Sequence, residues 1–166
     1  MQLLKISFYL IIFFISSNTL QADQVINPEK ACQYLSDERF RGNLDYKQVK
    51  NSEVYSCASL KKPVDRGEPS TSDLRYAVKG TQTSADQISL LLRMNSFKVS
   101  VPVLKEFIRV TEIIYSKAFD MSLPEDIKQS MLSAKAGEWQ HNGYTIKLLR
   151  QFDKTRTYEL VFIIES

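Results

Sequence analysis

The sequence predicts an α+β domain of two layers, in which an antiparallel sheet has helices packed on one of its faces. Apolar and polar residues alternate in short stretches of the first half of the chain and again near its end, which is typical of half-buried strands. Between these stretches the apolar residues recur at helical spacing. Runs of strands separated by a run of helices are typical of α+β proteins, and the expected order is α-β-β-β-α-α-β-β-β.

The first helix is expected to begin in the segment NPEKACQYLSDERF. Asn27 suits the N-cap position, and Pro28 suits the first helical position, where its missing N–H costs nothing. This helix should end by Phe40 or Gly42. Residues 43–52 are polar and weakly patterned, so the first strand is expected only in the segment EVYSCAS that follows them.

A surface loop and a hairpin should come next. Residues 60–72 contain two prolines, a glycine and several small polar residues, a composition typical of a surface loop. The segments DLRYAVKGT and DQISLLLRMN then alternate in polarity. We expect them to form two strands joined at GTQTSA, each with one side facing the core.

Two helices and three strands complete the expected fold. Apolar residues from Leu104 to Ala118 follow helical spacing and predict the principal core helix. Ser122 and Glu125 have the spacing of a capping box for a second helix, whose end Gly137 would suit. Asn142-Gly143 is a strong hairpin signal, and the apolar segment TYELVFIIES predicts a last strand inside the sheet.

The N-terminus predicts export. Residues 1–22 combine one cation, Lys5, with an apolar run of about a dozen residues, which is typical of a secretory signal peptide. The run is shorter than the roughly 20 residues of a membrane-spanning helix, so cleavage is favoured over an uncleaved anchor. Cleavage after Ala22 would leave residues 23–166 as a single α+β domain without stable membrane insertion.

The expected compartment determines how the two cysteines are interpreted. In an oxidising environment two cysteines usually pair, which predicts a Cys32–Cys57 disulfide that clamps the first helix onto the first strand. Loop entropy gives such a bond about 3.5 kcal/mol of stabilisation. The rival interpretation, a nucleophilic Cys57 with His141 as its base, needs a reduced thiol that export disfavours.

Composition and motifs argue against several functional classes. The exported part holds 21 basic and 19 acidic residues, because residues 1–22 remove only Lys5, and the two signs are mixed along the chain. Without a clustered basic face, nucleic acid is not an expected partner. HExxH, GxSxG and Walker-type motifs do not occur in the sequence. No catalytic residue, metal or other cofactor is therefore predicted, and the sole histidine, His141, is expected to be exposed beside a turn.

Aromatic and basic residues provide candidates for a contact surface, because tyrosine and tryptophan are enriched at interface hot spots. Most of the tyrosines fit core positions in the strand and helix patterns. The candidates that remain, together with basic residues of the 60–72 loop, are Tyr46, Tyr55, Trp139, Lys61, Lys62 and Arg66.

Three hypotheses about function follow from these patterns. The first is a small exported, non-catalytic binding protein of the bacterial envelope, such as an inhibitor or an immunity-type protein, with another protein as its partner. The second is a structural or assembly component of an envelope or secretion apparatus. The third is a metal-independent hydrolase with a carboxylate pair, which requires two acids of perturbed pKa in one cleft. The absence of an Asn-x-Ser/Thr sequon from residues 23–166 favours a bacterial periplasmic protein over a secreted eukaryotic one.

Overall fold

The structure, a computed structural model, describes residues 25–65, 72–94, 100–152 and 158–166. The predicted signal peptide and Arg66 lie outside the described residues. No helix within the described part of the chain is long and apolar enough to cross a membrane.

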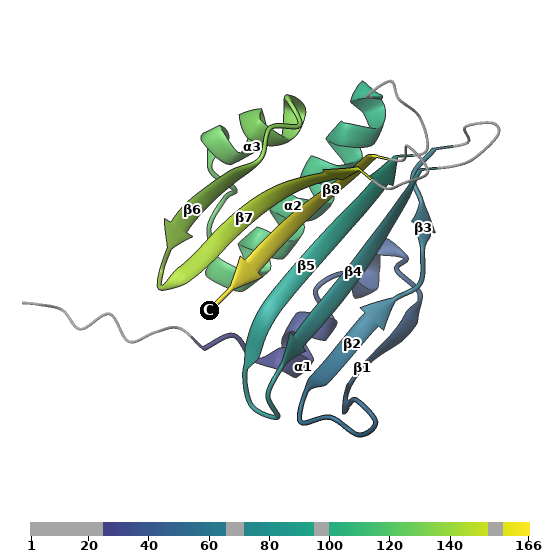
Figure 1. Cartoon of the computed structure of the whole chain (residues 1–166), viewed down its shortest axis with the longest axis vertical. Coiled ribbons are helices and arrows are strands. Elements are labelled where there is room, and N and C mark those ends of the chain that lie inside the picture. Colours follow the sequence, from purple (N-terminus) through teal and green to yellow (C-terminus); the bar gives the residue numbers. More distant parts are fainter. Residues whose placement is uncertain (1–24, 66–71, 95–99, 153–157) are drawn as a thin grey trace, which may run out of the picture.

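In the part of the chain that the structure describes, eight antiparallel strands form one sheet, which confirms the predicted fold class (Figure 1). Seven of them follow the order β1-β2-β4-β5-β8-β7-β6, and β3 pairs with β4 beside this path. The strands are β1 (Gly42–Gln48), β2 (Tyr55–Ser59), β3 (Lys62–Pro63), β4 (Asp73–Gly80), β5 (Ala85–Met94), β6 (Gly137–His141), β7 (Tyr144–Phe152) and β8 (Tyr158–Glu165). The central pairs β4–β5, β5–β8 and β7–β8 are long and nearly uninterrupted.

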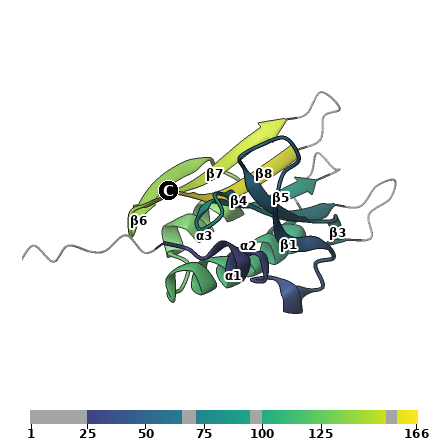
Figure 2. The ribbon, with the colours of Figure 1, turned by 90° about the horizontal axis from the view of Figure 1, so that it is seen from below.

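The helices all lie on one side of this sheet (Figure 2). They are α1 (Pro28–Cys32), α2 (Val101–Phe119) and α3 (Glu125–Leu132), and a 3-10 turn at Ser36–Glu38 follows α1. Strand residues that point toward the helices are buried, and the intervening residues are mostly half-buried or exposed. The core between the sheet and the helices includes Tyr76, Leu90, Phe107, Ile114 and Phe162, each with an exposed fraction of 0%. The predicted core helix, α2, is thus confirmed.

Two strands were not predicted. β1 lies in the polar, weakly patterned segment, and β3 is only two residues long. The expected first strand is therefore β2, the second strand of the sheet. Both missed strands lie at an edge of the sheet. There, backbone pairing with a neighbouring strand, rather than burial of one face, stabilises the strand.

The first helix is shorter than its expected limit, and the predicted bounds of the last helix were wrong. The first helix has only five residues, and the chain after it makes a 3-10 turn that ends at Arg39 in the left-handed region (φ 58°). The serine and aspartate of that turn favour turns over helix interiors. At the other helix, Pro124 occupies the N-cap position without a side-chain cap, so the expected capping role of Ser122 is wrong, and the helix ends at Leu132 rather than near Gly137.

Candidate binding cleft

A bulge in the edge strand β1 creates the most distinctive local geometry of the molecule. Asn43 pairs with Ala58 and Lys47 pairs with Ser56, so residues 44–46 lie opposite the single residue Cys57. A bulge of this kind interrupts the hydrogen-bond ladder and redirects the side chains of the bulged strand. Residues 44–46 are thereby released from regular pairing with β2.

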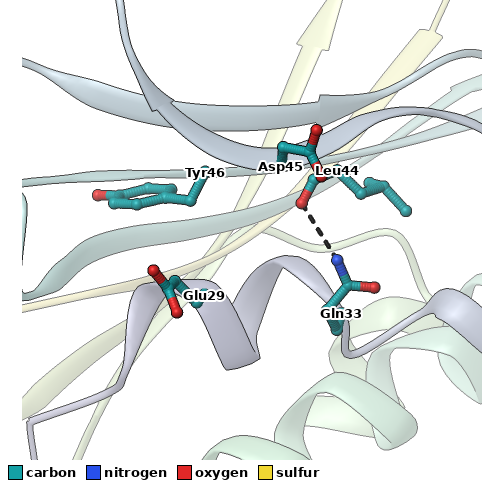
Figure 3. A pocket seen from close by; sticks show the side chains of 5 residues that line it. All are labelled: Glu29, Gln33, Leu44, Asp45 and Tyr46. Atoms are coloured by element: carbon teal, nitrogen blue, oxygen red, sulfur yellow. Dashed lines mark hydrogen bonds between the residues drawn. The ribbon is translucent and has the colours of Figure 1, made fainter.

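These redirected residues form one wall of a cleft, and α1 forms the other (Figure 3). The cleft has a volume of about 360 Å³. Its lining residues are Glu29 and Gln33, from α1 and its C-cap, and Leu44, Asp45 and Tyr46 from the bulge. The cleft therefore joins two segments whose proximity was not visible in the sequence.

Two interactions hold α1 against the sheet, and a third caps its N-terminus. The predicted disulfide is confirmed, and it joins Cys32 at the end of α1 to Cys57 on β2, with the two Cα atoms 6.1 Å apart. The Tyr76 hydroxyl donates to the carbonyl oxygen of Ala31 at 2.7 Å. At the other end, the backbone N–H of Lys30 donates to the Asn27 side chain at 2.9 Å, as its predicted N-cap role requires.

The disulfide occupies a specific place relative to the bulge. Cys57 is the β2 residue that lies opposite residues 44–46, so the bond attaches α1 to the sheet at the position where β1 departs from it. The bond therefore joins α1 to β2, not to the first strand of the sheet. Both cysteines are buried, and no free cysteine is present among the described residues. A structural role for Cys57 follows, in place of a nucleophilic one.

Hydrogen bonds also hold the two walls together. The Gln33 side-chain amide donates to the Leu44 carbonyl oxygen at 3.3 Å across the cleft (Figure 3). The Tyr46 hydroxyl donates to the Thr81 carbonyl oxygen at 2.8 Å, which ties the bulge to the turn between β4 and β5. A cleft braced in this way is preorganised, which lowers the cost of binding a ligand.

Tyr46 and Tyr55 lie side by side near the cleft, with their ring centroids 5.8 Å apart. Burial raises the pKa of Tyr46, and nearby Asp86 and Tyr55 raise it further. The phenol consequently keeps its proton at neutral pH and its hydrogen bond to Thr81. The structure thus brings together two of the six predicted contact residues.

The polar groups of the cleft are mostly acceptors. Glu29 is exposed, and Asp45 forms an ion pair with Lys47 at 3.0 Å, with 71% and 64% of these two side chains exposed. Such an exposed ion pair is weak and readily exchanged. One N–H of the Gln33 side-chain amide donates to Leu44, and the side-chain oxygen adds a further acceptor. Two carboxylates beside an aromatic ring suit an ammonium or guanidinium group.

The other predicted contact residues lie elsewhere. Trp139 is on β6, at the opposite edge of the sheet, where it packs against the core and over Gly137. Lys61 is exposed beside β3. The Lys62 ammonium lies 3.3 Å from Glu106 Oε1 and 4.9 Å from the Phe40 ring centroid, so it has structural partners.

A second group of charges surrounds Arg109 on α2. Its guanidinium lies 2.6 Å from Glu38 Oε2 and 2.8 Å from Glu106 Oε2. The hydrogen bond to Arg109 lowers the pKa of both carboxyl groups. A general acid would instead need a raised pKa, so this pair of acids is suited to holding the 3-10 turn against α2.

The sole histidine is placed differently from the expectation of an exposed ring. The His141 ring packs against α2, 4.9 Å from the Phe119 ring centroid and 5.5 Å from that of Tyr115, and its Nε2 atom is buried. Nothing in the sequence around the turn indicates this contact, because α2 is distant in the chain. Within the described ranges, no three His, Cys, Asp or Glu side chains lie together so that they could hold a metal ion.

Comparison with known protein families identifies the family of this chain. Residues 23–165 match the family of unknown function DUF6030. The chain belongs to this family. No curated protein and no solved structure matches the chain.

Proposed function

We propose that this protein is a small exported, non-catalytic binding protein of the bacterial envelope that engages a partner protein in the cleft between α1 and β1. The observation that carries the proposal is the cleft itself, in which a strand bulge and a disulfide-held helix place two carboxylates beside Tyr46. The disulfide fits an exported protein. The periplasm is the proposed address, and inhibition or neutralisation of the partner is the proposed role.

The chemistry of the cleft supports a cationic side chain of the partner as the occupant. Glu29 and Asp45 supply negative charge, and the Tyr46 ring supplies an aromatic wall. Arginine or lysine would replace the loose contact between Asp45 and Lys47. Hydrogen bonds between ionised partners are about twice as strong as neutral ones, so a few such contacts confer specificity.

A peptide titration tests the cleft directly. We would titrate the 15N-labelled chain, exported with its own N-terminal segment and purified without reductant, with an arginine-containing peptide and with the same peptide carrying citrulline. We expect shifts at the backbone amides of Glu29, Gln33 and residues 44–46 with the arginine peptide only. Equal shifts with both peptides, or shifts only at other sites, would contradict the proposal.

Matched variants test whether the cleft binds a protein. The Glu29→Gln, Asp45→Asn variant removes both carboxylates with little change in shape, and Glu53→Gln with Asp37→Asn removes two exposed acids that do not line the cleft. A protein that co-purifies stoichiometrically from the exported fraction should bind the first variant at least about tenfold more weakly and the second unchanged. Equal binding by both variants would place the partner on another surface.

A further inference from the structure

The face of the sheet opposite the helices, here called the open face, has an apolar centre. Leu91 on β5, Val161 on β8 and Leu149 on β7 are cross-strand neighbours in one row. Arg75 on β4, which pairs with Asp73 at 3.4 Å, continues this row beside Leu91. Ile163 lies in the next row, between Ser89 and Lys147. The three helices pack on the other side (Figure 2), and the leucines and Val161 are half-buried.

Charged residues flank this centre in balanced pairs. The Arg93 guanidinium lies 2.7 Å from Glu159 Oε1 at one end, and Lys147 pairs with Glu165 at the other. A face with no excess of either sign does not suit a strongly charged partner such as a nucleic acid. The open face suits a partner surface that also carries equal numbers of positive and negative charges. The open face of a second copy is such a surface.

We infer that the open face pairs with the open face of a second copy of this chain, through a two-fold axis that runs parallel to the strands between β5 and β8. Such an axis exchanges the positions of β5 and β8 and keeps each row in place. Arg93 then meets Glu159 of the partner subunit, and Leu91 meets Val161 of the partner subunit. The charges form an alternating group of four, as an isologous interface requires.

The sizes of the side chains match in the same arrangement. In the second row, Ile163 lies opposite the small Ser89 of the partner subunit, and Lys147 lies opposite Ala77 of the partner subunit. Facing layers that alternate large and small residues can interdigitate. An axis through β8 would instead bring each Glu159 against its own copy, and likewise each Glu165, so like-charge repulsion favours the axis between β5 and β8 over the axis through β8.

This inference is independent of the cleft, which lies between α1 and the edge strand β1. Sedimentation equilibrium of the exported, unreduced chain tests it, and we expect a reversible dimer. Val161→Lys should weaken the dimer at least about tenfold, whereas Val161→Thr keeps the shape and should retain it. A chain that is monomeric at every concentration, or a dimer that Val161→Lys leaves intact, would overturn the inference.

A pair of variants with opposite charge tests the register. Ala77→Lys places a cation opposite Lys147 of the partner subunit, and Ala77→Glu places an anion there. Both add a long charged side chain at the same half-buried position. We expect Ala77→Lys to dissociate the dimer several-fold more readily than Ala77→Glu, with both variants folded as judged by circular dichroism. Equal dissociation of the two variants, or a dimer in which Ala77→Lys is the tighter, would contradict the proposed axis.

Discussion

The two faces of the sheet are built from the same strands, yet they differ in almost every physical property. On β8, Phe162 faces the helices with 0% of its surface exposed, while its neighbour Val161 faces the opposite side and is half-buried. The covered face holds the aromatic and large aliphatic core. The open face combines leucines, β-branched residues, small residues and charged pairs. Because successive residues of a strand face opposite sides of the sheet, one set of positions determines stability and the other determines surface chemistry. A substitution can therefore change one property without the other.

The largest expected effect on stability comes from comparing substitutions at two adjacent residues of β8, one on the covered face and one on the open face. Phe162→Ala should lower the free energy of unfolding by about 3–5 kcal/mol, because it leaves a cavity between β8 and α2. Val161→Thr should change it by less than about 1 kcal/mol, because threonine keeps the branched shape on a half-buried surface. Urea unfolding monitored by circular dichroism measures both values. Similar losses for the two variants would show that the open face is buried as deeply as the covered one.

The next effect concerns the attachment of the helical layer to the covered face. Replacing both Cys32 and Cys57 with alanine should lower the free energy of unfolding by about 2–4 kcal/mol, because the unfolded chain regains the entropy of an open loop. Reduction of the wild-type chain should give a similar loss. If both thiols react with an alkylating agent before reduction, the bond is absent in the native protein and the predicted loss fails.

A smaller, pH-dependent effect comes from the charges around Arg109. The pKa values of Glu38 and Glu106 are lowered from 4.5, chiefly by hydrogen bonds to Arg109. The lowered values add stability above about pH 4.5, which is lost as the pH falls through the folded-state values. Arg109→Met should therefore lower stability at pH 7 by about 0.5–1 kcal/mol, because the pairs are partly exposed, and should lower it less at pH 3.

A control distinguishes this effect from a general loss of positive charge. Lys61→Met removes an exposed cation beside β3 and should leave the difference in stability between pH 7 and pH 3 unchanged. Urea unfolding at the two pH values measures this for both variants. If Arg109→Met has as large a pH difference as the wild type, then Arg109 does not set the pKa values of the two acids.

The smallest expected effect on stability comes from the carboxylates of the cleft, which belong neither to the covered face nor to the open face of the sheet. Glu29→Gln together with Asp45→Asn should change the free energy of unfolding by less than about 0.5 kcal/mol, because both side chains are exposed and Asp45 has only a loose ion pair. Thermal unfolding measures the change. A marked loss of stability would indicate that the two carboxylates support the fold, and it would remove them as candidates for binding alone.

Much of the fold could be predicted because local patterns coincide with tertiary burial. The helical spacing from Leu104 to Ala118 identified α2, and the alternation of β4, β5 and β8 identified three neighbouring strands. The bulged strand β1 could not be identified in this way, because it alternates weakly and its pairing with β2 is interrupted. The placement of Trp139 against the core was missed for a related reason, since a single half-buried side chain leaves no periodic signal.

By itself, the sequence determined the α+β class, the order of most elements and the Cys32–Cys57 bond. Periodicity encodes which residues are buried, and two cysteines allow a single intramolecular pairing. Only the tertiary structure decided that Tyr46 lies beside Tyr55, that the bulge faces α1 across a cleft, and that Arg93 and Glu159 flank one apolar centre. These features depend on strand register and on contacts between distant segments, and neither leaves a local pattern in the chain.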